Sequence, residues 1–304
     1  MLQRDCHCER KNLTMNDRFD RNIRFFGEAG QQLIEACSVA IVGIGGLGTH
    51  IVQQLALLGV GKLVLIDSEE LDVTNLNRYV GTRAEDPIPG TPKVEIGERL
   101  AKSINPQIQI AKVYNSLVSQ AAFNGVIHSD YVFGCLDREG ARLILNELCA
   151  AYSRPYFDLA SEIIPGDRVE YGGRIYIAWD GQGCIACSGV LDNDEAQSDL
   201  SGPEGQRNRA ALYGIKPELL GKTGPSVVSI NGVVASLAVT EFMVAVTEIR
   251  SPNRLTSYYG HKGIVTVSKD EPSPDCYYCK NIRGRGDEAD VQRYIRDGVG
   301  KFLR

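Results

Sequence analysis

The fold is decided by the stretch Ser38-Val-Ala-Ile-Val-Gly-Ile-Gly-Gly-Leu-Gly48 and by the run Lys62-Leu-Val-Leu-Ile-Asp67 that follows it. Residues 39–42 are apolar and mostly β-branched, which predicts a buried parallel strand. Residues 49–58 predict a helix, and residues 63–66 predict a second strand that ends in an acid. A strand–helix–strand unit is therefore expected at this point of the chain.

Three glycines of the first stretch follow the predicted strand in the spacing G-x-G-x-x-G. Gly43, Gly45 and Gly48 allow a tight turn, a close approach of backbone to phosphate groups and close packing of helix on strand. The N–H groups that open the following helix point toward an anion. Asp67 is placed to accept hydrogen bonds from ribose hydroxyls. The pattern predicts a nucleotide site, and a βαβ turn without a ligand is the alternative.

Bulk composition is that of an ordinary globular protein. The chain has 304 residues, of which 43% are apolar and 23% charged, and its formal net charge of −5 argues against general nucleic-acid binding. The start of the chain shows no apolar signal segment. Residues 227–246 are the longest apolar stretch, but Ser229, Asn231 and Glu241 interrupt it, which favours a buried helix over a membrane span. Nine cysteines without a secretory signal indicate a reducing, cytoplasmic setting.

A second acidic strand end strengthens the nucleotide prediction. Residues 130–137 predict a strand that ends at Asp137, and residues 138–152 predict the helix after it. Asp67 and Asp137 would then face the same edge of one sheet, where a magnesium nucleotide needs one acid for the ribose and one for the metal. The alternative role for Asp137 is to cap the following helix. Further elements are expected at 93–104 (helix), 108–113 (strand) and 155–160 (strand).

The pattern changes after residue 168. Residues 168–170 and 174–179 alternate as antiparallel strands, and Gly172-Gly173 predicts a hairpin turn between them. Residues 255–259 and 264–267 alternate again. We expect a tail at 1–16, a nucleotide-binding part at 17–165, a substrate-binding and zinc part at 166–280, and a tail at 281–304, in one continuous domain. Short helices are expected at 18–26, 26–37 and 287–303, and a long mobile crossover at 188–224.

Two C-x-x-C pairs, Cys184/Cys187 and Cys276/Cys279, can supply four thiolates to one tetrahedral zinc ion. The long separation of the pairs makes such a site a clip between distant segments. All four ligand positions would be filled, so the metal would be structural. Two unrelated pairs, or redox thiols, are the alternatives.

In their order along the chain these signals resemble the E1-like activating enzymes of the ThiF, MoeB and HesA type. The resemblance runs from about Arg18 to Cys279. Its motifs are Arg18-Phe-Asp-Arg21, Gly43-Ile-Gly45-Gly46-Leu-Gly48, Asp67, Asn75-Leu-Asn-Arg78, Lys93, Cys135-Leu-Asp137 and both cysteine pairs. It implies a Rossmann-like, mostly parallel sheet with flanking helices, an antiparallel C-terminal extension and a structural zinc clip.

The resemblance also implies an activity. Such enzymes transfer AMP from magnesium ATP to the C-terminal carboxylate of a ubiquitin-like or sulfur-carrier protein, usually one ending in Gly-Gly, and release pyrophosphate. By resemblance the glycine loop, with Gly46, binds ATP, Asp67 holds the ribose and Asp137 the magnesium. Asn75, Arg78 and Lys93 would contact the phosphates. Arg21 would reach across a homodimer interface into the partner's site, and Arg18 is a weaker candidate for that role.

Two departures from the family pattern limit what is carried over. No cysteine lies between Cys187 and Cys276, where relatives that form a thioester or persulfide usually have one, so adenylation alone is expected. Arg138 stands where many relatives have Asn. The main alternative is the same chemistry on a peptide C-terminus or a tRNA-linked carboxylate. An NAD-dependent oxidoreductase and a non-catalytic partner subunit are weaker alternatives.

Overall fold

A computed structural model describes residues 15–166, 168–179, 181, 183–201, 224–269 and 271–296. The expected tail at 1–16 is described only for Met15 and Asn16, and the end of the second tail lies outside the described residues. The same holds for residues 202–223 of the expected crossover.

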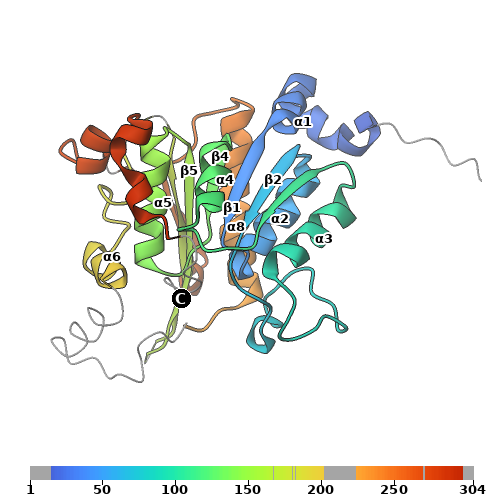
Figure 1. Cartoon of the computed structure of the whole chain (residues 1–304). Helices are drawn as coiled ribbons and strands as arrows, with labels where there is room; N and C mark the ends of the chain where they lie inside the picture. Colours follow the sequence, from blue (N-terminus) through green and yellow to red (C-terminus); the bar gives the residue numbers. More distant parts are fainter. Residues whose placement is uncertain are drawn as a thin grey trace, which may run out of the picture.

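One eight-stranded sheet runs through the molecule in the order β3-β2-β1-β4-β5-β6-β7-β8 (Figure 1). The first five strands in this order are parallel, and β5 to β8 pair antiparallel. The expected parallel sheet with an antiparallel extension is confirmed. The strands are β1 (Ser38–Val42), β2 (Lys62–Ile66), β3 (Gln109–Val113), β4 (Tyr131–Gly134), β5 (Tyr156–Ile164), β6 (Glu170–Ala178), β7 (Leu255–Tyr259) and β8 (Ile264–Ser268).

Helices cover both faces of the sheet and bury two apolar cores. On one face lie α2 (Gly46–Leu58), α3 (Lys93–Ile104) and α8 (Val228–Val246), and on the other α4 (Gln120–Ile127) and α5 (Glu139–Ala151). The chain therefore leaves β1 toward one face and leaves β4 toward the other. At such a switch point the loops diverge and leave a crevice at the carboxyl edge of the two strands.

Helix α1 (Met15–Ala36) lies at the other end of the strands, away from their carboxyl edge. Gly27 breaks it with a positive φ of 78°, so the two short helices expected here are confirmed as two halves of one kinked element. Phe19 is buried, and its ring lies against Gly59, which ends α2. Arg18 donates to the carbonyl of Ile104 at the end of α3 (2.5 Å). These contacts place α1 at the amino ends of the strands, because α2 and α3 run antiparallel to them.

The hairpin expected at Gly172-Gly173 is wrong. Strand β6 runs straight through both glycines, and the chain reverses before it, between β5 and β6. A Cβ on Gly172 would lie 1.9 Å from the carbonyl oxygen of Tyr258, and one on Gly173 would lie 2.4 Å from that of Ala160. The glycines serve close packing of neighbouring strands rather than a turn.

Two expectations about irregular and helical segments are also wrong within the described residues. Residues 193–200 of the expected crossover form helix α6 (Asn193–Leu200), which Asp192 caps by accepting from the backbone N–H of Glu195. The C-terminal helix expected from residue 287 is instead two 3₁₀ turns, Gly286–Ala289 and Val291–Tyr294.

Helix α8 is long and apolar enough to cross a membrane by length and composition alone. Half of it is buried in the fold, where it packs on β5, β6 and α2. Glu241, the acid within it, pairs with Arg250 (2.6 Å) and accepts from the backbone of Asn253 (2.8 Å). These contacts support the expected core helix.

The glycine loop between β1 and α2 is built by backbone contact. Gly43 has φ of 90°, and a Cβ on it would lie 2.4 Å from the carbonyl oxygen of Cys135, just after β4. A Cβ on Gly48 would lie 2.0 Å from the carbonyl oxygen of Gly43. Gly45 differs, because no atom lies within 4 Å of its Cβ position. The loop is thus pressed against β4 and open at Gly45.

Gly48→Ala is expected to lower the free energy of unfolding by about 2–3 kcal/mol, because backbone must move to admit the methyl group. Gly45→Ala is the matched control and is expected to change it by less than about 0.5 kcal/mol, since its φ of −91° suits any residue. Urea denaturation measures both. Equal losses in the two variants would contradict the role given to the Gly43–Gly48 contact.

Candidate active site

Asp67 ties the end of β2 to the glycine loop. One carboxylate oxygen accepts from the backbone N–H of Ile44 (2.7 Å) and the other from that of Glu69 (2.8 Å). Burial raises the pKa of Asp67, and the nearby Lys93 ammonium opposes that rise. The Tyr79 hydroxyl donates to the carbonyl of Ile44 from the other side. Each carboxylate oxygen still has a second lone pair, so the geometry leaves room for the ribose contact expected of Asp67.

Two of the three expected phosphate contacts lie on the loop after β2. Asn75 closes a capping box: its side-chain oxygen accepts from Asp72 N–H (3.0 Å). The Arg78 guanidinium donates to the carbonyl of Thr74 (2.5 Å). The Arg78 methylenes lie 3.3–3.4 Å from where a Cβ on Gly46 would stand, so this arginine lies over the first residue of α2. A cation is thus held beside the N–H groups of that helix, which attract anions.

Lys93 is the first residue of α3 and is buried, with 7% of its surface exposed. Its ammonium pairs with the Glu69 carboxylate at 2.5 Å. A buried ammonium needs such a partner, and a phosphate that reached it would share or replace Glu69. Lys93 also lies close to Asp67 at the carboxyl end of β2.

Asp137 is exposed on the loop from β4 to α5. The residue that caps α5 is Arg138, so the alternative that Asp137 is the cap is wrong. Because β2 and β4 flank β1 and all three are parallel, Asp67 and Asp137 stand at the same edge of the sheet. An exposed carboxylate in this position suits a magnesium ion that also binds phosphate oxygens.

One buried residue of this region was not predicted as part of the site. Asn231 of α8 is 2% exposed; it accepts from the Ser161 hydroxyl (2.7 Å) and donates to the Ser226 hydroxyl (3.1 Å). Its amide nitrogen lies 2.5 Å from the Cβ position of Gly46. It thus joins β5, the start of α8 and the glycine loop. The available signal was a polar residue inside an apolar helix.

Arg21 is not brought to this site. It is exposed on α1, at the opposite edge of the sheet, and makes no hydrogen bond or ion pair with the part of the chain that the structure describes. Arg18 is held by its own chain through Ile104. Of these two arginines, Arg21 is the one with no partner among the described residues.

The four cysteines of the two C-x-x-C pairs come together, with all sulfurs within 4.8 Å of one another. Cys184 and Cys276 are 3.6 Å apart and Cys187 and Cys279 are 3.9 Å apart, sulfur to sulfur. A tetrahedral zinc ion with bonds of about 2.3 Å separates its sulfurs by about 3.8 Å. A hydrogen bond from Cys184, aided by the Arg283 guanidinium, lowers the pKa of Cys279 to about 5. The donor set fits zinc, and the alternative of two unrelated pairs is wrong.

Cys184→Ser is expected to lose metal and stability together, because a structural zinc site contributes folding energy. Elemental analysis gives the zinc content and thermal unfolding gives the stability. Cys37→Ala, which instead removes a buried thiol between α1 and β1, should keep its metal. A Cys184→Ser protein that stays replete with zinc would contradict the clip.

The chain is similar to known adenylyltransferases. It is 32% identical over 161 residues to the sulfur carrier protein ThiS adenylyltransferase of Escherichia coli, covering 52% of this chain and 60% of the relative. It is 34% identical over 184 residues to the molybdopterin-synthase adenylyltransferase of the same organism, covering 59% of this chain and 70% of the relative. The chain thus spans only part of these relatives.

Solved structures agree on the fold. Escherichia coli MccB with MccA-N7isoASN aligns with 87% of this chain and 75% of its own, at a TM-score of 0.68 and 21% identity. The profile of the ThiF family matches residues 19–278. Because that match covers most of the chain, this protein belongs to the ThiF family, whose E1-like members the sequence motifs resemble.

Proposed function

We propose that this protein is an ATP-dependent adenylyltransferase. It activates the C-terminal carboxylate of a ubiquitin-like or sulfur-carrier protein ending in Gly-Gly as an acyl-adenylate and releases pyrophosphate. The observation that carries the proposal is the gathering of the glycine loop, Asp67, Arg78, Lys93 and Asp137 at one edge of β1, β2 and β4. Relatives named as adenylyltransferases of a sulfur carrier and of molybdopterin synthase support it.

The protein's task in this reaction is alignment and charge neutralisation. The acceptor carboxylate attacks the α-phosphorus of ATP, and the bond to pyrophosphate breaks. Asp67 would hold the ribose, and Arg78, Lys93 and Asn75 would lie along the phosphates at the N-terminus of α2. A magnesium ion bound by Asp137 would reduce the negative charge on the phosphate oxygens. Zinc at the four cysteines would have a structural role only.

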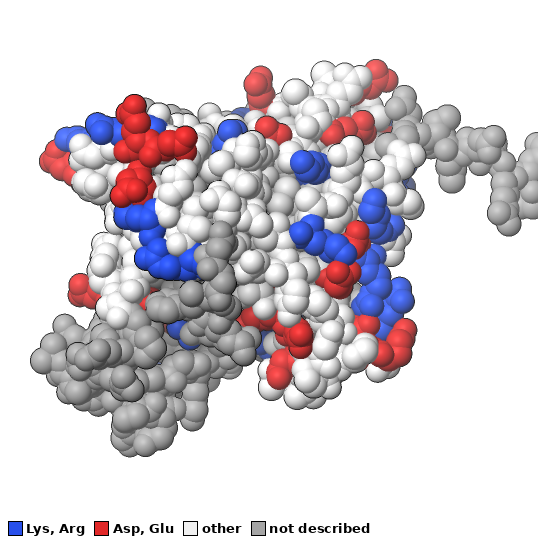
Figure 2. All heavy atoms as spheres, in the orientation of Figure 1, with Lys and Arg blue, Asp and Glu red and all other residues white. Residues whose placement is uncertain are grey.

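The acceptor protein would bind on the side of residues 166–280, where the antiparallel strands lie. On the face drawn in Figure 2 the groups of basic side chains lie beside acidic ones, and the formal net charge of the chain is −5, which favours a protein acceptor over nucleic acid. The similarity to biosynthetic adenylyltransferases and the free thiols among the described residues favour a cytoplasmic location.

ATP–pyrophosphate exchange tests the function directly. We expect exchange with a Gly-Gly carrier protein and none with the same carrier lacking its last two residues. Asp137→Asn, which keeps the shape and removes the charge, should reduce exchange roughly a hundredfold or more. A protein that binds ATP but exchanges with no carrier would contradict the proposed substrate and direct the search to peptide or tRNA acceptors.

We also propose a homodimer in which Arg21 enters the partner's site. Arg21 lies at the far edge of the sheet from the site of its own chain. On its outer side α8 carries Val233 and Leu237, half-buried among Ser229, Ser236 and Thr240, and together they line a groove of about 430 Å³. A groove of this kind, with apolar side chains rimmed by small polar ones, fits a surface that a second protein covers.

Arg21→Ala should be inactive alone, yet a mixture with Asp137→Asn should regain activity, because one of the two sites in each mixed dimer keeps both residues. Subunit exchange before the exchange assay allows mixed dimers to form. Arg24→Ala, which removes an exposed arginine paired with Asp20 on the same helix, is the control and should stay active. A mixture as inactive as its components would argue against the role across the interface.

A further inference from the structure

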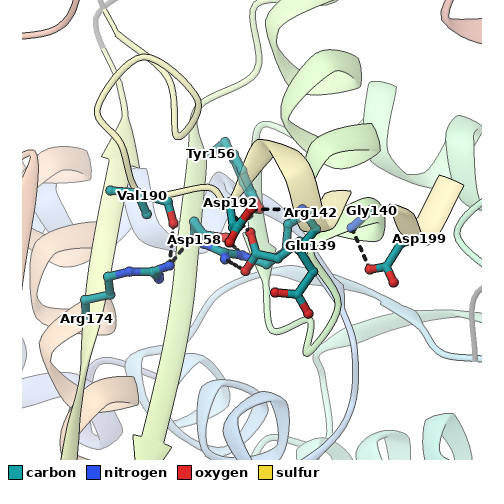
Figure 3. A network of polar contacts seen from close by, with 10 residues as sticks. Glu139, Gly140, Arg142, Tyr156, Asp158, Arg174, Val190, Asp192 and Asp199 are labelled. Atoms are coloured by element: carbon teal, nitrogen blue, oxygen red, sulfur yellow. Dashed lines mark hydrogen bonds and ion pairs between the residues drawn. The ribbon is translucent and has the colours of Figure 1, made fainter. Parts of the chain in front are cut away.

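A buried charge network joins β5 and β6 to the first turn of α5, the helix that follows the Asp137 loop (Figure 3). Asp158 of β5 is fully buried. The Arg142 guanidinium donates to both of its oxygens, through Nε at 2.9 Å and through a second nitrogen, and the Tyr156 hydroxyl donates at 2.9 Å. A bidentate pair of this kind fixes the relative position of α5 and β5.

Two further charged residues link Arg142 and Asp158 to residues 190–192, which follow Cys184 and Cys187 in the chain. Arg174 of β6 lies 3.5 Å from Asp158 and donates to the carbonyl of Val190 (2.6 Å). Glu139 of α5 accepts from Arg142 and from the backbone N–H of Asp192 (3.0 Å). The network thus has two cations, Arg142 and Arg174, and two anions, Asp158 and Glu139. Arg174 holds the carbonyl of Val190, and Glu139 holds the N–H of Asp192, two residues further on.

A third contact joins the same segment to the first turn of α5. The Asp199 carboxylate of α6 accepts from the backbone N–H of Gly140 (3.0 Å). The fit is close, since a Cβ on Gly140 would lie 2.6 Å from the Cβ of Asp199, and Ala196 of α6 is fully buried. Gly140 is three residues after Asp137. The segment 190–201 is therefore held at two points to the first turn of α5, which directly follows the Asp137 loop, and at a third point to Arg174 of β6.

We propose that Glu139, Arg174 and Asp199 are positioning residues that couple segment 190–201 to the Asp137 loop. The inference rests on the proposed function, in which Asp137 takes the magnesium of ATP and the acceptor protein binds on the side of residues 166–280. Binding of magnesium nucleotide fixes the Asp137 loop, and the three contacts pass that order to segment 190–201 on the acceptor side. Order gained at one site then lowers the entropy cost of ordering the other.

Hydrogen exchange measures this coupling without reference to activity. With α,β-methylene ATP and magnesium bound to the full-length protein, backbone N–H groups of residues 190–201 should exchange about fivefold more slowly or better. In Asp199→Ala the slowing should fall below about twofold, while the nucleotide Kd stays within about threefold of wild type. Asp194→Ala, on the exposed side of the same helix, is the matched control and should behave as wild type.

Asp199→Asn separates the hydrogen bond from the charge, because its amide oxygen still accepts from Gly140. It should keep the slowing, whereas a purely electrostatic role would lose it. Wild-type protein that binds the nucleotide without slowing residues 190–201 would overturn the coupling, as would Asp199→Ala with full slowing. Wild-type protein that binds no nucleotide at all would instead contradict the proposed function, and the coupling with it.

Discussion

The contact on which the site depends is that between the glycine loop and the end of β4. Backbone oxygens occupy the space that side chains on Gly43 and Gly48 would need. Ile44, between them, is held by two hydrogen bonds: its N–H donates to Asp67 at the end of β2, and its carbonyl accepts from the Tyr79 hydroxyl. This fixes where α2 begins. The N–H groups of α2, the Arg78 side chain over Gly46 and the Asp137 loop then take their places around the same crevice. A looser loop would shift the α2 N–H groups, Arg78 and the Asp137 loop relative to one another. In the proposed adenylation, alignment of the reactants is the enzyme's main contribution.

The parts of the structure that the sequence predicted are those set by local pattern and by topology. Runs such as residues 39–42 and 63–66 are apolar and short, and they form buried parallel strands as expected. Once three strands are parallel, their carboxyl ends must share an edge, so Asp67 and Asp137 are brought to one side without any knowledge of the side-chain packing. The four cysteines were predictable for a similar reason, because their chemistry limits what such a set can do.

The parts that were missed depend on partners far along the chain. The pair Gly172-Gly173 has the local appearance of a turn, but carbonyl oxygens of both neighbouring strands require glycine there. Helix α6 has weak helical pattern and is held by α5 through Asp199. Asn231 and the Arg142–Asp158 pair likewise gain their meaning from residues that the sequence does not place beside them. A polar residue in an apolar helix signals that a partner exists without identifying it.

The charges at the carboxyl edge of the sheet bear on the proposed homodimer. Lys93 is already paired with Glu69, and Arg78 already donates to a backbone carbonyl, so neither is an unengaged cation waiting for phosphate. Asp67 and Asp137 add negative charge to the same edge. The three phosphates of ATP at this edge would bring more negative charge than the nearby cations could neutralise. The approach of the acceptor carboxylate would add one more negative charge. In the proposed reaction a metal ion at Asp137 and a cation from a second chain would supply the missing positive charge, and the exposed Arg21 is the side chain proposed for that second role.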